Sequence, residues 1–397
     1  MSFKGEVVVI GAGVVGLSIA KSLLESNNGI TVTILEKESE IGMHSSGRNS
    51  GVLHAGFYYS PDSLKARFCR EGNHQLRMHC EEFQLPIREF GKVVVSRSQE
   101  EDLHLEALFN RGIENGIKLE LLDQKELADL EPLARTFRRF IWSPTTAVAD
   151  PVRVLATLKT KVENLGGKIV FNSKYDSRIT YSKLVDNQAI HVINASGSQA
   201  DRIAKSFGFG KQFVMVPFMG LYRYVSPEKF PLKRLVYPVP NPKNPFLGVH
   251  FTITESGKVK IGPTAIPLLN REQYSLFENW NLTDMKESIE GMHSMYRGNT
   301  HDIHKLIRTE VPKFSKSQLI RDAATLVPIS TQISGWQKMK PGIRAQLVNI
   351  ENGELASDFI VEGDSQSTHI LNAVSPGWTA ALPFGKFIAD QVLSKLV

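Results

Sequence analysis

A glycine-rich turn near the start of the chain has the residue types that bind dinucleotide phosphates. Glycines at positions 11, 13 and 16 follow four β-branched residues, and a second apolar run from Ile30 to Leu35 ends at an acid. In this arrangement the glycines permit the turn, the backbone's approach to a pyrophosphate and the packing of helix on strand, while the acid binds ribose hydroxyls. The spacing predicts a dinucleotide site that contains Gly11, Gly13, Val14, Val15, Gly16, Glu36 and Lys37.

The bulk composition is that of an ordinary globular protein. The 397 residues suggest two connected domains, and 42% are hydrophobic. The 47 basic and 41 acidic residues give a net charge of +6 without a basic run, which argues against nucleic-acid binding. Cys69 and Cys80 lie about three turns apart on one predicted helix, too far to bridge, and form no zinc motif, so we expect reduced thiols and no metal. The start shows no secretory pattern and no run reaches eighteen apolar residues, which favours a cytoplasmic protein.

The elements that must position the chemistry change in type along the chain. Helices are predicted at 63–83 and 99–115 and a strand at 92–96, which breaks strand–helix alternation. Asp150 caps a helix to 164, and strands at 168–171 and 190–194 return to the nucleotide layer, where Ala195 and Gly197 form a turn facing the cofactor. Antiparallel strands follow Val214, then helical sequence at 282–311 and a last helix from about Phe384.

This pattern predicts an α/β protein with a discontinuous Rossmann-like domain and an inserted α+β domain built on a mostly antiparallel sheet. The predicted dinucleotide domain covers 1–85, 145–212 and 325–397. The predicted substrate domain covers 86–144 and 213–324.

A small-residue loop, 42–56, follows the acid, where nicotinamide dehydrogenases usually continue strand–helix alternation. The loop resembles the second flavin-contacting loop of the D-amino-acid oxidase-like FAD enzymes. More narrowly, Gly47–Tyr59 and Ser63–Ala66 resemble the L-2-hydroxyglutarate dehydrogenase/oxidase family, as do Pro245–Thr252, Gly342–Gln346 and Asn372–Pro376 in the same order. The resemblance implies FAD as the cofactor. It adds to the predicted cofactor site Ser45, Ser46, Arg48, Asn49, Ser50, Gly51, Gly342, Arg344, Gly377, Trp378 and Thr379.

The chain departs from the family in several places, including Trp378, where close relatives have a small residue. The family usually has Pro-Phe-Arg-Gly followed by an acid, whereas this chain has Met219 and Leu221. Joint loss of a paired arginine and acid is nearly neutral for stability, but if that arginine holds the distal carboxylate of hydroxyglutarate, the substrate differs. The segment between Phe171 and Ile190 is also shorter than the family's.

Oxidation of a 2-hydroxy acid needs a base for the hydroxyl proton and a cation for the carboxylate. His54 and His250 are the candidate bases, with a slight preference for His54 because it lies close to the small-residue loop. Arg344 resembles the arginine that binds a substrate carboxylate in related oxidases. Each histidine could instead be a buried structural residue, and Arg344 could form a salt bridge. Tyr59 and Tyr237 are weaker candidates for substrate contact.

The resulting hypothesis is FAD-dependent oxidation of L-2-hydroxyglutarate or a near relative to the 2-oxo acid, by hydride transfer to flavin N5, with a quinone, dye or oxygen as electron acceptor. An amino-acid or secondary-amine oxidase and a non-catalytic flavin-binding subunit are the alternatives. An apolar stripe at the end of the chain, Phe387 to Leu396, is either a peripheral contact with the inner membrane surface or core packing.

Overall fold

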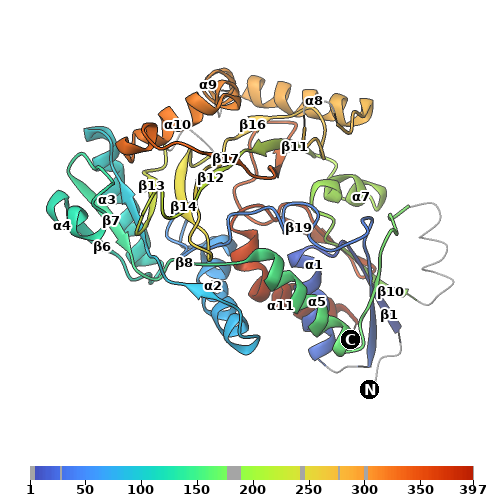
Figure 1. Ribbon diagram of the computed structural model, residues 1–397. Helices are drawn as coiled ribbons and strands as arrows, with labels where there is room; N and C mark the ends of the chain where they lie inside the picture. Colours follow the sequence, from blue (N-terminus) through green and yellow to red (C-terminus); the bar gives the residue numbers. More distant parts are fainter. Residues whose placement is uncertain are drawn as a thin grey trace.

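The computed structural model describes residues 5–26, 29–176, 189–241, 246–275, 278–298 and 303–396. A dinucleotide-binding part, which holds both chain ends, lies beside a part dominated by one large twisted sheet (Figure 1). The departure predicted between Phe171 and Ile190 falls mostly on 177–188, outside the described residues.

The dinucleotide-binding part is a six-stranded sheet in the order β19-β20-β10-β1-β2-β9. All neighbouring pairs are parallel except β19 with β20. The strands are β1 (Gly5–Ile10), β2 (Ile30–Leu35), β9 (Lys168–Val170), β10 (Ala189–Asn194), β19 (Val361–Gly363) and β20 (Ser367–Ile370). The helices beside it are α1 (Val14–Glu25), α2 (Leu64–Glu82), α5 (Pro151–Asn164), α7 (Ala200–Ser206) and α11 (Gly377–Leu396).

The second part is built on an eight-stranded sheet in the order β17-β12-β15-β14-β13-β5-β7-β6. Its pairs are antiparallel except β13 with β5. The strands are β5 (Lys92–Val95), β6 (Glu120–Asp123), β7 (Arg139–Ser143), β12 (Arg223–Val225), β13 (Leu235–Pro238), β14 (His250–Ile253), β15 (Val259–Gly262) and β17 (Gln337–Lys338). The helices of this part are α3 (Gln99–Glu114), α4 (Gln124–Leu130), α8 (Leu282–Gly298), α9 (Ile303–Glu310) and α10 (Lys316–Ala324).

Two small sheets join the parts. In one, β11 (Phe213–Gly220) lies between β16 (Ile266–Pro267) and β18 (Gly342–Asn349), and Phe218 pairs with Arg344. In the other, β8 (Ala147–Ala149) lies between β3 (Val52–Leu53) and β4 (Ile87–Arg88). The predicted α/β class with a mostly antiparallel second sheet is confirmed, while the predicted domain boundaries stay a prediction.

Local sequence signals explain several helix starts. The Asp150 carboxylate accepts from the Val152 N–H at 2.8 Å and caps α5, as predicted. The Ser63 hydroxyl accepts from the Ala66 N–H at 3.1 Å and caps α2. Both cysteines lie on α2 as buried free thiols, in agreement with the predicted reduced state.

The predicted start of the last helix is wrong by seven residues. We expected the helix from about Phe384, but α11 begins at Gly377 and continues through Pro383, a residue type that usually ends or bends a helix. The carbonyl of Thr379, four residues before Pro383, lies against α2, where a Cβ on Gly72 would stand 2.0 Å from it. Close packing on α2 therefore stabilises a turn of α11 that local preference disfavours.

The apolar stripe of α11 packs on the protein itself. Phe384, Ile388 and Val392 are buried in the core cluster that contains α1, and Phe387, Leu393 and Leu396 pack against that cluster. Of the two alternatives for this stripe, core packing is the one that the described residues support, because its apolar surface packs against α1 and α2. Among the described residues, no helix combines the length and hydropathy that a membrane span needs.

Candidate active site

Two glycines of the first turn occupy positions at which a side chain would collide with the backbone. Gly11 has φ +102°, and a Cβ there would stand 2.7 Å from the Ala195 carbonyl oxygen. A Cβ on Gly16 would stand 2.0 Å from the Gly11 oxygen. The close approach of three backbone segments brings the C-terminal ends of β1 and β10 to one edge of the sheet, beside the start of α1, which is the position of a bound pyrophosphate in this fold.

Glu36 is held at the end of β2 by backbone donors. Its Oε2 accepts from the Ala12 N–H at 2.8 Å and its Oε1 from the Glu38 N–H at 3.0 Å. The residue is 8% exposed and lines the central cavity. These bonds orient a carboxylate whose remaining lone pairs suit a ribose diol.

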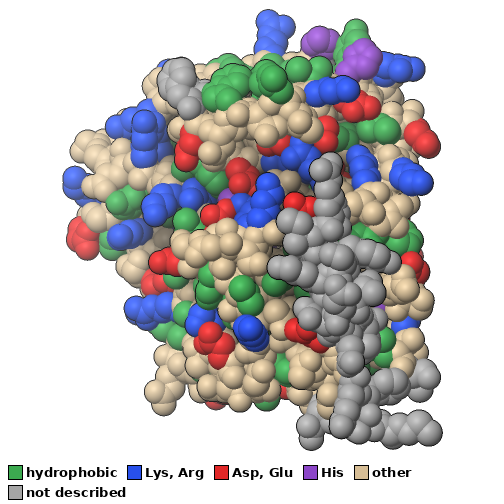
Figure 2. Space-filling view, turned by 90° about the vertical axis from the view of Figure 1, so that its right-hand side faces the viewer, with side chains coloured by type: hydrophobic (Ala, Val, Ile, Leu, Met, Phe, Trp, Pro, Cys, Tyr) green, Lys and Arg blue, Asp and Glu red, His purple; other side chains and the backbone are tan. Residues whose placement is uncertain are grey.

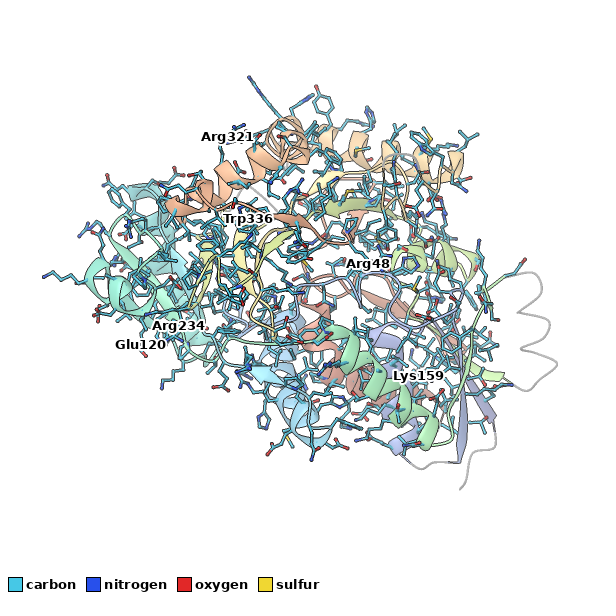
Figure 3. All side chains as sticks on the ribbon, in the orientation of Figure 1. Arg48, Glu120, Lys159, Arg234, Arg321 and Trp336 are labelled. Carbon is cyan, nitrogen blue, oxygen red and sulfur yellow. The ribbon has the colours of Figure 1, made fainter. Side chains whose placement is uncertain are left out.

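Hydroxyls of the small-residue loop connect the turn to a distant strand. The Ser46 hydroxyl accepts from the Val14 N–H at 3.0 Å, and the Ser45 hydroxyl donates to the Ile343 carbonyl at 2.8 Å. Arg48 donates to the Met43 carbonyl at 2.7 Å and lies over the Tyr274 ring. Figure 3 shows Arg48 between the two parts of the molecule. The loop therefore fits between α1 and β18, as a wall shared by both parts.

One long cavity of about 510 Å³ runs along these elements. It extends from Glu36 past the loop to the first turn of α11, so two helix N-termini face it. Its lining includes the predicted cofactor residues Gly11, Gly13, Val14, Val15, Glu36, Lys37, Ser45, Ser46, Arg48, Asn49, Ser50, Ala195, Gly197, Gly342, Arg344, Gly377, Trp378 and Thr379. Gly16 and Gly51 are not part of the lining. The narrow turn at Gly11 and the placement of Glu36 fit an elongated dinucleotide such as FAD.

Thr379 ties His54 to the start of α11. The Thr379 hydroxyl donates to the Val52 carbonyl at 3.1 Å and accepts from the His54 N–H at 3.2 Å. The Asn73 amide of α2 donates to the His54 carbonyl at 3.1 Å. His54 is thus fixed at the end of β3 with its side chain lining the cavity.

Both candidate histidines are strongly biased towards the neutral form. Burial, followed by the positive charge of Lys92, lowers the pKa of His54 to about 3. Burial also lowers the pKa of His250 to about 3. The His250 Nδ1–H donates to the Gly248 carbonyl at 2.9 Å, and its ring stacks on Tyr237 at 3.9 Å between centroids. His250 therefore lies behind the cavity wall, and His54 is the histidine of the pair that reaches the cavity.

Arg344 presents a guanidinium to the cavity from β18. Burial lowers its pKa, and within the described part of the chain no carboxylate pairs with it. Its Cζ lies 5.1 Å from the Phe246 ring centroid. Among described residues, Glu36 is the one acid in the cavity lining. The described residues therefore do not support the alternative in which Arg344 forms a structural salt bridge.

The two tyrosines named from the sequence lie beside the cavity and not in its lining. The hydroxyl of Tyr59 bonds to Ser375, and burial raises the pKa of Tyr59. Burial also raises the pKa of Tyr237, the ring partner of His250. Tyr222 and Phe246, which sequence reasoning did not name as site residues, line the cavity.

Lys92 is a further residue that sequence reasoning missed. It is fully buried on β5, and its Nζ lies 4.4, 4.5 and 4.9 Å from the ring centroids of Phe57, Tyr58 and Tyr237. Burial lowers the pKa of Lys92 to about 7. A lysine in a strand is an ordinary sequence feature, and only the three converging rings identify it as a cation next to the histidines.

Met219 and Leu221, the departures from the family pattern, face away from the cavity. The strand alternates, so Phe218, Gly220 and Tyr222 line the cavity while Met219 packs with Ile266, Leu268 and Ile343, and Leu221 joins that apolar cluster. The missing charges therefore affect a packed cluster behind the wall.

The dinucleotide turn, the small-residue loop and a base–arginine pair in one cavity define an FAD-linked oxidoreductase of the D-amino-acid oxidase-like class. The family model described as FAD dependent oxidoreductase matches residues 6–391. A glycerophosphate oxidase from Mycoplasma pneumoniae with FAD bound has this fold, with TM-score 0.73 and 20% identity over 99% of this chain and 95% of that one. A glycine oxidase from Geobacillus kaustophilus matches with TM-score 0.70 and 18% identity over 98% and 95%.

The sequence relatives are more specific than the structures. This chain is 34% identical to L-2-hydroxyglutarate dehydrogenase of Caenorhabditis briggsae, over 99% of this chain and 94% of that one. It is 32% identical to the enzyme of that name from Escherichia coli K12, over 98% and 93%. The chain belongs to the L-2-hydroxyglutarate dehydrogenase family of FAD-dependent oxidoreductases, and FAD is its cofactor.

We expect Glu36→Ala to weaken FAD binding by about 10- to 100-fold, because a buried charged hydrogen-bond acceptor contributes roughly 1.5–3 kcal/mol. Fluorescence titration of the apoprotein with FAD measures the affinity. Glu40→Ala, an exposed acid on the same loop, is the matched control and leaves the affinity unchanged. Equal affinity in both variants would contradict the assignment of Glu36.

Proposed function

We propose that this protein oxidises L-2-hydroxyglutarate, a 2-hydroxy acid, to 2-oxoglutarate. The observation that carries the proposal is an unpaired guanidinium, Arg344, facing the same cavity as the neutral base candidate His54. The names of the relatives support the substrate. The position of Met219 and Leu221 supports it too, because neither residue is part of the cavity lining.

The side chains divide the chemistry between them. Arg344 binds the substrate's C1 carboxylate, since its planar fork matches two carboxylate oxygens. His54 accepts the hydroxyl proton at an imidazole nitrogen, which burial keeps unprotonated. Bound FAD supplies the acceptor for the hydride that leaves C2. Phe246 and Tyr222 enclose the site and exclude water from it.

His250 acts in this proposal as a positioning residue. Its Nδ1–H is committed to Gly248, and its ring supports Tyr237 and hence the aromatic cluster around Lys92. An amine substrate does not need a base for a hydroxyl proton, so a neutral histidine at the cavity favours a hydroxy acid over the amine-oxidase alternative.

Anaerobic mixing with L-2-hydroxyglutarate should bleach the visible flavin absorption, whereas amino acids and secondary amines should not.

Arg344→Met should raise KM by about 100-fold, because a charge-assisted bond to a carboxylate is lost. The KM of Arg344→Lys should lie between that of Arg344→Met and that of the wild type. Stopped-flow absorbance and steady-state kinetics measure these effects. Bleaching by amines instead would support the alternative oxidase, and no bleaching by any of these substrates a non-catalytic flavoprotein.

We expect that protonation of His54 does not lower kcat/KM between pH 8 and pH 5, as it would if this histidine had a pKa near 6.5. A base whose pKa lies at about 3 stays neutral over that range and is protonated only at lower pH. His54→Asn should lower kcat by about 100-fold or more. His250→Asn should act less, since the residue lies outside the cavity lining. An acid limb with a pKa near 6.5 that disappears in His54→Asn, or full activity of His54→Asn, would contradict the role of His54, whereas a limb that persists in that variant belongs to another group such as Lys92.

We also propose that the electrons leave to a quinone, dye or oxygen, and that the protein contacts a membrane surface through α8. Leu282, Ile289 and Tyr296 recur every seven residues on α8 and are 83%, 53% and 55% exposed, beside Trp280 at 57%. The upper edge of the molecule, where α8 lies, shows apolar side chains together with basic ones and histidines (Figure 2). A cytoplasmic location, peripheral to the inner membrane surface, is consistent with this face and stays a prediction.

Trp280→Glu/Leu282→Glu should abolish co-sedimentation with vesicles that contain phosphatidylglycerol, because acids replace the exposed apolar side chains. Leu103→Glu/Val152→Glu changes two apolar residues elsewhere that are 65% and 59% exposed, and is the control. A membrane surface at α8 would be contradicted if the control variant lost vesicle binding while the α8 variant kept it. It would also be contradicted if neither the wild type nor the control bound the vesicles.

A further inference from the structure

A second, smaller pocket of about 380 Å³ lies on the other side of the small-residue loop. It is lined by the loop residues 47–49, by strands β12 and β15 and by the segment at and after β17. Its charged lining is entirely basic among the described residues: Arg48, Lys258, Lys260, Lys338 and Lys340.

The pleat of β12 and β15 places two of these lysines on one face of the sheet. Tyr224 pairs with Lys260 across β12 and β15, so their side chains share one face of the sheet. Lys258 lies two residues before Lys260 and Tyr222 two before Tyr224, which places them on that face as well. Lys338 and Lys340 are exposed at the rim of the pocket.

These lysines are not neutralised by ion pairs. None of the four forms a salt bridge within the described part of the chain. Lys260 is 4% exposed, and its ammonium donates to the Ser50 carbonyl at 2.9 Å. Burial lowers its pKa to about 8, against the opposing charges of Asp150 and Glu255. A small pocket lined by several cations without an ion-pair partner attracts anions, although Asp150 and Glu255 act on Lys260 from nearby.

The pocket adjoins the active-site cavity. Arg48, Asn49 and Tyr222 line both spaces. Tyr222 lies close enough to Arg344 that the guanidinium counteracts the rise that burial causes in the tyrosine's pKa, to about 12. Positive charge therefore continues from the exposed Lys338 and Lys340, past the buried Lys260, to the substrate-binding arginine.

We propose that this basic pocket is an outer binding site for a small dicarboxylate, which captures the dianionic substrate before it reaches Arg344. The inference rests on the proposed function for the identity of the dianion. The volume suits a five-carbon acid. A substrate with two carboxylates engages the outer lysines with one group while the other advances. The pocket thus raises the rate of capture.

The kinetic test compares Lys338→Gln/Lys340→Gln with Lys118→Gln/Lys125→Gln, which removes the same charge from exposed positions remote from the pocket. At low ionic strength the first pair should lower kcat/KM for L-2-hydroxyglutarate about five- to tenfold, with the effect on kcat/KM rather than kcat. Its kcat/KM should also fall less steeply with added salt. Equal values and equal salt dependence in the two pairs would overturn the proposal.

A binding test does not depend on turnover, so it separates failure of this proposal from failure of the proposed function. Glutarate, which has no hydroxyl to oxidise, is titrated calorimetrically into Arg344→Met and into Arg344→Met/Lys338→Gln/Lys340→Gln. Removal of the inner cation leaves the outer pocket as the remaining site, and we expect at least fivefold weaker binding in the triple variant. Equal binding in both, or a pocket that binds inorganic phosphate and not glutarate, would overturn the assignment.

Discussion

The hydroxyl of Thr379 holds the two ends of the active site together. It bonds to the carbonyl of Val52 and accepts from the N–H of His54, more than 300 residues earlier in the chain. Gly72 lets α2 approach the Thr379 carbonyl, since any side chain there would collide with it. Because α11 is in turn packed on α1, the base, the start of the last helix and the dinucleotide turn are joined through one packed core. Preorganisation of this kind is what places a base within reach of a bound substrate.

The charge distribution around the cavity is strongly one-sided. Lys92 is fully buried and Arg344 is half-buried at the cavity, and neither has a carboxylate partner among the described residues. A buried charge without a partner costs free energy that the fold must offset elsewhere. Lys92 is partly compensated by three aromatic faces, whereas Arg344 is placed to be compensated by a substrate carboxylate. The same cations help to keep His54 neutral, so carboxylate binding and proton acceptance depend on one electrostatic field.

The departures at Met219 and Leu221 show why side-chain direction matters more than position in a motif. On β11 the residues that alternate with them, Phe218 and Gly220, form the cavity wall. Met219 is 2% exposed and packs with Ile266 and Ile343. Joint replacement of an arginine and an acid by apolar residues leaves no stranded charge in such a cluster. The substitution therefore changes packing between β11, β16 and β18 and leaves the substrate-facing groups in place.

The sequence by itself determined the dinucleotide turn, the small-residue loop, the capped helices and the mixed architecture, because these depend on local glycine geometry, capping and periodicity. It also identified His54 and Arg344 as candidate site residues, but it did not show that both line the same cavity. Only the tertiary structure decided that Arg344 lies opposite Phe218, that His250 stands behind the wall and that Lys92 enters an aromatic cluster. It also decided that α11 passes through Pro383. Each of these outcomes depends on pairing and packing between residues far apart in the chain, and local sequence preference carries no information about such contacts.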